Sequence, residues 1–295
     1  MPLEDFIISV YCCVVDSYSR LVDGRLRRRG FEPKLTDSEV ITMEIVGEFL
    51  GKDQDKRIWR YFRNHWHSWF PQLGSRTNFA KQCANLWVIK QRIQEHLAVE
   101  LGAYYDLIHI VDGFPMPVCL LIRAPHSTCF KGHAEVGYCA TKEAYYYGFE
   151  GHLMISLDGV ISGYTFAPAN VDERDVLQDM TCHIHGLLIG DKGFIRPVLK
   201  AELAKQGIDL QTPLRKNMTD TRSASWVQVL MSARRRIETV ISQLAERFNI
   251  EKVQARDLWH LTNRFVRKLL AHTLAVFLNS RLQREPLQFE GLVQV

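Results

Sequence analysis

Length, composition and charge exclude several classes of protein. The chain has 295 residues, of which 46% are hydrophobic and 24% charged, which is typical of globular proteins and unlike disordered or fibrous chains. No apolar run approaches the ~18 residues that a membrane-spanning helix needs. The seven cysteines are an odd number without paired spacing, which indicates reduced thiols. We therefore expect a cytoplasmic protein with no membrane partner.

The charge is distributed unevenly along the chain. Residues 1–191 contain 19 Lys and Arg against 24 Asp and Glu, whereas residues 192–295 contain 18 against 9. Clustered Lys and Arg raise the electrostatic potential near phosphates, so the basic C-terminal third favours a polyanionic partner. Solvated helices are often basic as well, and the charge alone leaves that alternative open.

The first hundred residues predict helices. Thr36 and Glu39 have the spacing of a capping box, and apolar residues then recur at helical spacing up to Gly51. Gly102 marks a plausible boundary after the last of these helices. The expected helices span residues 3–21, 37–50, 56–70 and about 78–101.

The helix expected at residues 56–70 interleaves basic and aromatic side chains. Aromatic residues at this spacing usually pack into a core, which would leave Arg57, Arg60 and Arg63 on the outer face, available to DNA phosphates. Together with the helix before it, this segment could form part of a helix-turn-helix.

The pattern changes to α/β after Gly102. Asp158-Gly159 is a dipeptide that favours a tight hairpin turn between two of the expected strands. The order of elements predicts a mixed five-stranded sheet with flanking helices. The expected strands span residues 107–111, 145–156, 160–166, 187–190 and 208–213, and the helices residues 170–180, 197–206 and 225–282.

Three acidic residues stand at chemically suggestive positions. Asp112 and Asp191 each follow an apolar strand, where a half-buried carboxylate is costly unless something compensates it. Glu238 lies at the border of an apolar helix face. The alternatives are ordinary turn residues for the two aspartates and an i,i+4 ion pair between Arg234 and Glu238, worth only ~0.3–0.5 kcal/mol.

Convergence of these carboxylates would require a cation. All-oxygen ligands suit Mg²⁺ or Mn²⁺, and two such ions about 3.5–4 Å apart support in-line phosphoryl transfer. With a basic C-terminal region beside such a site, the substrate indicated is a nucleic-acid backbone.

These residues carry a resemblance to a known family. Three short segments resemble the three acidic motifs of DDE insertion-sequence transposases: Val-Asp-Gly-Phe-Pro, Gly-Asp-Lys-Gly-Phe and Arg-Arg-Ile-Glu-Thr-Val. Their acidic residues are 79 and 47 positions apart. The resemblance covers roughly residues 35–278 and is greatest to insertion-sequence family nine-eight-two. It implies a ribonuclease-H-like catalytic core in which Asp112, Asp191 and Glu238 bind two Mg²⁺ ions, with Mn²⁺ as a substitute.

The same resemblance implies the reaction and the partners. The enzyme would nick transposon ends and join the freed 3′-hydroxyl to target DNA without a covalent protein intermediate. Its partners would be double-stranded DNA, as terminal inverted repeats and as target, and further copies of itself in a dimer or larger synaptic assembly. The alternatives are a related metal-dependent nuclease without strand transfer and a non-catalytic DNA-binding protein derived from a transposase.

One part of the family pattern is absent. Arg234 matches the family's Arg position, but Met231 stands at its Tyr position and Ala245 at its Lys position, so the Lys contact to the transposon end is not carried over. Arg247 or Lys252 could replace it. The expected DNA contacts of the catalytic region are Lys192, Arg234, Arg235, Arg236 and Arg247.

These predictions give a domain plan. Residues 1–102 would form a helical DNA-binding or dimerisation domain, residues 103–282 the catalytic domain, and residues 283–295 a tail.

Overall fold

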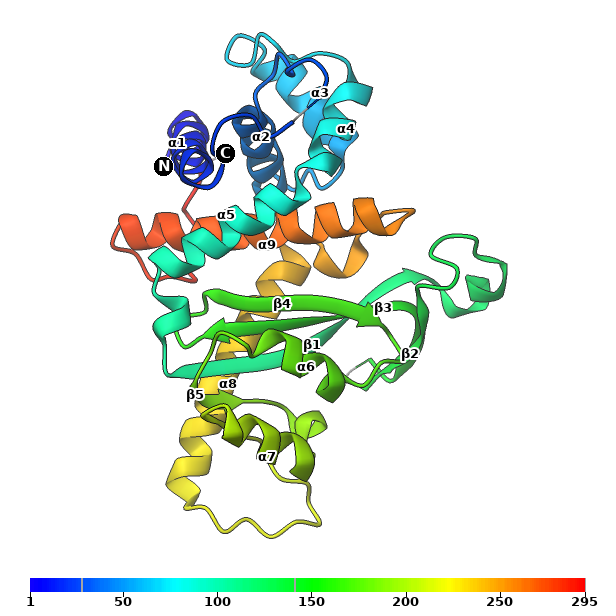
Figure 1. Ribbon diagram of the computed structural model, residues 1–295, viewed down its shortest axis with the longest axis vertical. Helices are drawn as coiled ribbons and strands as arrows, with labels where there is room; N and C mark the ends of the chain where they lie inside the picture. The colour runs from blue at the N-terminus through cyan, green and yellow to red at the C-terminus, as the bar shows by residue number, and fades with distance from the viewer. Residues whose placement is uncertain (28, 141, 295) are drawn as a thin grey trace. The chain divides into compact units, whose positions relative to one another are not determined.

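The chain folds into two compact units. A computed structural model describes residues 1–27, 29–140 and 142–294 (Figure 1). One unit, called the helical unit below, contains residues 1–97 and 244–295, and the other, the sheet unit, contains residues 98–243. This division differs from the boundaries predicted at residues 102 and 282, because the last helix packs against the N-terminal helices instead of joining the sheet.

The helical unit is built around α2 and α9. Twelve of the thirteen residues of α2 are buried, and α9 is buried along most of its length. The predicted capping box is confirmed: the Glu39 amide donates to Thr36 Oγ1, and the Thr36 amide donates to Glu39 Oε2. The helices of this unit are α1 (Leu3–Leu21), α2 (Asp37–Phe49), α3 (Asp55–His65), α4 (Arg76–Asn85), α5 (Trp87–Glu100, which extends past residue 97) and α9 (Leu258–Arg281), with a 3-10 turn at Ile250–Lys252.

Several predicted helices have different ends. The helix expected at 56–70 ends at His65, and turns occupy the residues that follow it. The helix expected at 78–101 is two helices, α4 and α5, separated by the fully buried Leu86. The helical stretch expected at 225–282 is likewise divided into α8 (Ala224–Glu246) and α9.

The sheet unit contains a mixed sheet in the strand order β2-β3-β1-β5-β6, with β4 pairing β3. β1 runs antiparallel to β3 and parallel to β5, and β5 runs parallel to β6. The Asp158-Gly159 turn joins β3 and β4 as predicted, with Gly159 at a positive φ of 84°. The strands are β1 (Ile108–Cys119), β2 (Glu135–Cys139), β3 (Ala144–Ser156), β4 (Ile161–Pro168), β5 (Gly186–Ile189) and β6 (Ile208–Gln211).

Among the residues that the structure describes, the sheet has six strands, one more than the five predicted. The missed strand, β2, is short and lacks an apolar run, and it forms because the first part of β3 offers it a partner. β1 is also much longer than the strand predicted at 107–111, and it continues through Pro115 and Pro117. The register between β1 and β3 shifts just after Pro117, as is usual where a proline interrupts a ladder.

Helices pack against both faces of the sheet. Side chains from α6 (Glu173–Met180) and α7 (Pro197–Lys205) form a core with Val111, Met154 and Leu188 of the strands. In Figure 1, α6 is drawn in front of the sheet and α8 behind it. Ile237 and Val240 of α8 are fully buried, so this helix is fixed firmly in place.

No helix among the described residues is long and apolar enough to cross a membrane.

Candidate active site

The two aspartates lie at the same level of neighbouring parallel strands. Ile110 of β1 pairs with Ile189 of β5, and Asp112 and Asp191 each follow two residues later. The carboxyl ends of parallel neighbours meet at one edge, so this register brings the two side chains together. Asp112 is still within β1, whereas Asp191 lies in the loop before a 3-10 turn (Lys192–Phe194).

Arg234 of α8 connects the three predicted carboxylates. Its Nη2 lies 3.0 Å from Asp112 Oδ2 and 3.6 Å from Asp191 Oδ1, and its Nη1 lies 2.9 Å from Glu238 Oε1. The predicted ion pair between Arg234 and Glu238 is therefore present, as one part of a larger cluster. The structure brings Asp112, Asp191 and Glu238 to one guanidinium.

The described residues contain no group of three His, Cys, Asp or Glu side chains close enough to hold a metal ion as they stand. Asp112, Asp191 and Glu238 are called the triad below. The guanidinium of Arg234 occupies the position between their carboxylates. All three carboxylates nevertheless lie within 3.6 Å of that guanidinium.

Exposure and charge differ across the triad. The side chains of Asp112, Asp191 and Glu238 are 18%, 43% and 54% exposed, so the site is open on the side of the last two. The pKa of Asp112 is raised to about 6, mainly by burial and in smaller part by the charges of Asp191 and Glu238, while Arg234 and the Gly113 amide oppose this rise. The environment of Asp112 therefore disfavours the carboxylate form unless more positive charge is supplied.

Two further carboxylates lie close to the triad. Glu150 Oε1 is 3.0 Å from the position of a Cβ built on Gly113, and the Glu173 carboxylate occupies the space that a Cβ on Gly193 would need. Burial and the neighbouring carboxylates raise the pKa of both Glu150 and Glu173 to about 7. No metal-binding role was predicted from the sequence for Glu150 or Glu173. The glycines beside the two aspartates were the available signal, since they leave room for a close neighbour.

The donor set fits a hard divalent cation. The carboxylates of Asp112, Asp191 and Glu238 pair with one guanidinium, that of Arg234, and Glu150 and Glu173 lie near enough for the charge of Asp112 to raise the pKa of each. Oxygen ligands with excess negative charge are what Mg²⁺ and Mn²⁺ prefer in proteins. Burial is the main cause of the raised pKa values of Asp112, Glu150 and Glu173, and the neighbouring carboxylates raise them in the same direction.

The predicted DNA contacts of the catalytic region fall in different places. Lys192, Arg235 and Arg236 are exposed in the sheet unit, Lys192 directly after Asp191. The guanidinium of Arg234 makes ion pairs with the carboxylates of the triad. Arg247 belongs to the helical unit, where its guanidinium lies 5.0 Å from the centroid of the Phe49 ring.

A second group of cations lines an open pocket of about 430 Å³ in the helical unit. Arg57 and Arg60 of α3 and Lys52 before it share this pocket with Tyr61 and His65, and we call it the α3 pocket. Lys52 Nζ lies 4.3 Å from the centroid of the Tyr61 ring. Burial and the charge of Arg57 lower the pKa of Lys52, so positive charges gather here without a matching carboxylate among the described residues.

The third arginine of α3 points elsewhere. Arg63 donates from Nη1 to the backbone oxygen of Leu73 at 3.2 Å and does not line the α3 pocket. The expectation that the aromatic residues of this segment pack inward holds for Phe62 and Phe70, which are buried. Trp69 is exposed.

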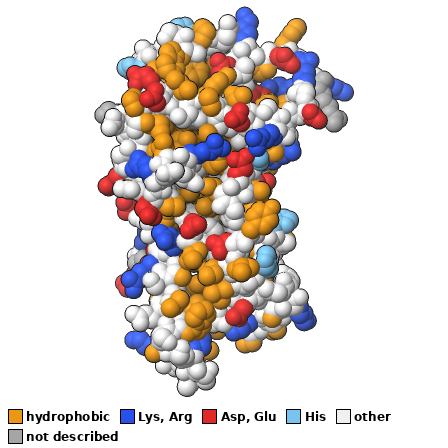
Figure 2. Space-filling view, turned by 90° about the vertical axis from the view of Figure 1, so that its left-hand side faces the viewer, with side chains coloured by type: hydrophobic (Ala, Val, Ile, Leu, Met, Phe, Trp, Pro, Cys, Tyr) orange, Lys and Arg blue, Asp and Glu red, His pale blue; other side chains and the backbone are white. Residues whose placement is uncertain are grey.

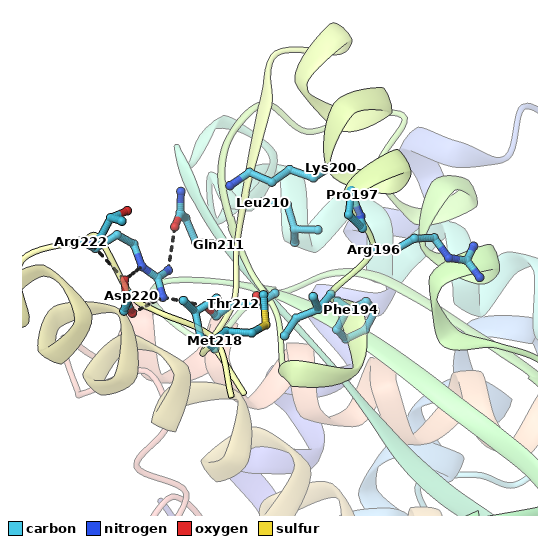
Figure 3. Close-up of a pocket in the computed structure, with 13 residues that line it drawn as sticks. Phe194, Arg196, Pro197, Lys200, Leu210, Gln211, Thr212, Met218, Asp220 and Arg222 are labelled. Atoms are coloured by element: carbon cyan, nitrogen blue, oxygen red, sulfur yellow. Dashed lines mark hydrogen bonds and ion pairs between the residues drawn. The ribbon is translucent and has the colours of Figure 1, made fainter. Parts of the chain in front are cut away.

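A cavity of about 400 Å³ lies beside the loop that carries Asp191 (Figure 3). Both arginines that line it are already paired. Arg222 donates to Asp220, to Gln211 Oε1 and to the Thr212 oxygen, and Arg196, which points away from the other labelled side chains in Figure 3, pairs with Asp172 and Asp175. None of the triad carboxylates lines this cavity.

Basic residues do not form a continuous surface on the face shown in Figure 2, where Lys and Arg are interspersed with Asp and Glu.

Comparison with known proteins identifies the family of this chain. A family model described as the transposase DDE domain matches residues 103–258, which is more than half of the chain. The chain therefore belongs to the transposase DDE domain family, and its fold is the predicted ribonuclease-H-like α/β sheet with a helical N-terminal region. Searches among curated proteins and among solved structures find no match. The match does not distinguish insertion-sequence families, so the resemblance to family nine-eight-two stays a prediction.

Proposed function

We propose that this protein is the transposase of an insertion sequence, which cleaves transposon ends and joins the 3′-hydroxyl to target DNA. The observation that carries the proposal is the convergence of Asp112, Asp191 and Glu238 on Arg234 within a transposase DDE domain. The double-stranded DNA substrates would be the terminal inverted repeats and the target.

The three triad carboxylates would hold two Mg²⁺ ions, or Mn²⁺ as a substitute. Such ions, when bound, activate the attacking oxygen and stabilise the leaving oxygen of an in-line displacement. Asp112 is fixed by β1 and by the Gly113 amide, which donates to Oδ1 at 2.9 Å, so its carboxylate is already oriented. Glu238 and Asp191 are more exposed, and they face the side from which a DNA strand can approach.

Two steps complete the proposed reaction. In the first, water attacks the phosphorus at the transposon end, the bond to the 3′-oxygen breaks, and that oxygen takes up a proton. In the second, the freed 3′-hydroxyl attacks a target phosphodiester, so that one ester bond forms as another breaks and no covalent protein intermediate is needed. Lys192, Arg235 and Arg236 are exposed cations that would contact the phosphates near this site.

Joining two ends requires that both be held together, and we include a homodimer or larger synaptic assembly in the proposal. The helical unit would also bind DNA. Its α2 and α3, with α3 exposing Arg57 and Arg60, are the helices that a helix-turn-helix would use.

A strand-joining assay tests the proposed function. Pre-cleaved duplexes that carry the element's terminal repeats are incubated with the protein, Mn²⁺ and a supercoiled target plasmid. We expect products in which the 3′ end of the duplex is joined to the target DNA through a new phosphodiester bond. Products of hydrolysis alone would favour a nuclease without strand transfer, and binding without any cleavage would favour a non-catalytic DNA-binding protein.

The α3 pocket gives a separate prediction about DNA binding. Changing Arg57 and Arg60 together to Gln should weaken DNA binding and make it less dependent on salt. Removal of one cation that binds a phosphate lowers the slope of log affinity against log salt by about 0.9. The measurement is fluorescence anisotropy of a labelled duplex at four or more salt concentrations.

The matched control changes two exposed cations of the same unit, Lys81 and Arg92, which do not line the α3 pocket. This control removes the same charge and should leave the slope nearly unchanged. Equal effects of the two double variants would show that the α3 pocket makes no specific phosphate contact.

A further inference from the structure

Arg234 occupies a position that a divalent cation would otherwise take. One guanidinium makes ion pairs with Asp112, Asp191 and Glu238 at 3.0, 3.6 and 2.9 Å, and its side chain is only 15% exposed. An arginine that only oriented Glu238 would need a single carboxylate partner. Contact with all three carboxylates indicates that Arg234 supplies the positive charge of the cluster.

The same guanidinium is poorly satisfied in this place. Its Nε is buried and has no hydrogen-bond partner among the described residues, while both terminal nitrogens are used by the triad. A buried donor without a partner costs free energy. Arg234 is therefore held by the negative charge of the triad and not by a complete hydrogen-bond network. Another cation could replace such a side chain at the triad.

Arg234 and a divalent cation compete for the same oxygen atoms. Mg²⁺ and Mn²⁺ need carboxylate oxygens at about 2.0–2.2 Å, and a guanidinium between those oxygens repels the ion electrostatically. A single positive charge also leaves the three carboxylates with an excess of negative charge, so a divalent ion compensates them better. Metal binding must therefore move the guanidinium out of the cluster.

We propose that Arg234 is an internal counter-cation, which occupies the triad in the metal-free protein and is displaced when divalent metal binds. This inference rests on the proposed function, because it assumes that the triad carboxylates bind metal. Arg234 keeps the carboxylates assembled before metal arrives, and it lowers the apparent affinity for metal by the free energy needed to displace it.

Binding of Mn²⁺ alone, without DNA, tests the exchange. The dissociation constant is measured by isothermal titration calorimetry and by the electron paramagnetic resonance signal of free Mn²⁺, for the unchanged protein and for Arg234→Gln. We expect Arg234→Gln to bind Mn²⁺ at least tenfold more tightly, because the competing cation is gone. Arg234→Lys, which keeps the charge but loses the fork, should lie between the two.

Arg235→Gln is the control for charge alone. It removes the same charge one position along α8, from an exposed side chain for which the described residues show no contact with the triad, and should change the dissociation constant less than twofold. Equal or weaker Mn²⁺ binding by both Arg234 variants, with the unchanged protein binding normally, would overturn the exchange and leave the metal site intact. Absence of Mn²⁺ binding in all of these proteins would overturn the proposed function as well.

Folding of the variants is followed in the same samples. Without metal, Arg234→Gln should unfold at a lower temperature, because its three carboxylates then repel each other without a counter-charge. Mn²⁺ should raise its melting temperature by more than it raises that of the unchanged protein. An equal rise in both proteins would contradict the proposal.

Discussion

Replacing Asp112 with Asn should lower metal-dependent DNA cleavage by about three orders of magnitude, which corresponds to about 4 kcal/mol in the barrier. Asn keeps the size of the side chain but removes the negative charge that a divalent cation needs most, since Asp112 is the most buried carboxylate of the triad. The measurement is the initial rate of Mn²⁺-dependent nicking of a labelled transposon end. A variant that keeps a tenth of the activity or more would show that Asp112 is not a metal ligand.

The same substitution should not harm the fold. The pKa of Asp112 is raised from 3.8 to about 6 in the folded, metal-free protein, mainly by burial, so the ionised carboxylate is less stable there than in the unfolded chain. Above about pH 6 this effect lowers the free energy of unfolding, and it disappears as the pH falls towards 4. We expect Asp112→Asn to be at least as stable as the parent at pH 7.5, with no gain near pH 4. DNA binding should be largely kept.

Replacing Arg267 with Met should destabilise the helical unit by about 3–5 kcal/mol, which is the usual cost of removing one partner of a buried ion pair. The fully buried Arg267 donates to Glu48 at 2.6 Å, to Asp55 at 2.8 Å, to Glu44 at 3.2 Å and to the backbone oxygen of Asp53 at 2.6 Å. Met fills a similar volume but leaves the carboxylates with less positive charge. The measurement is urea unfolding followed by far-ultraviolet circular dichroism.

The control for this prediction is Arg256→Met, which removes the same charge from an exposed position just before α9. Its free energy of unfolding should change by less than about 0.5 kcal/mol. A failure of Arg267→Met to fold at all would agree with the expected loss. A change of less than about 1 kcal/mol would show that the carboxylates of α2 and α3 do not depend on Arg267.

Much of the sheet unit could be predicted from local patterns. Apolar runs precede Asp112 and Asp191, and Asp158-Gly159 is a turn dipeptide. These local patterns predicted strands and a hairpin, and both are present. The three acidic motifs likewise predicted which carboxylates would meet. β2 was missed because a short polar strand is stabilised by the neighbour it pairs with, and no local pattern shows that neighbour.

The charged interior of the helical unit could not be predicted. Lys90, Arg267 and Lys268 are fully or almost fully buried and pair with Glu44 and Glu48, although such residues are usually exposed. A charged residue on an apolar helix looks like a surface residue until its partners on other helices are known. This network also explains why α9 belongs with α2 and not with the sheet, contrary to the predicted boundary at residue 282.

Arg234 illustrates the same limit at the candidate site. Its spacing to Glu238 predicted an i,i+4 ion pair, which is present, but the contacts to Asp112 and Asp191 come from a sheet more than 40 residues away in sequence. Glu173 approaches the site through the first turn of α6, and only the missing side chain of Gly193 could have pointed to it.

The position of bound metal tests the account most directly. Crystals of the protein soaked in Mn²⁺ can be measured at the manganese absorption edge, where anomalous scattering locates each ion without reference to the protein atoms. We expect anomalous peaks between Asp112, Asp191 and Glu238, with the Arg234 side chain moved out of the cluster. Fully occupied Mn²⁺ sites only at other positions, with Arg234 still between the three carboxylates, would contradict the proposed metal site and the proposed displacement of Arg234.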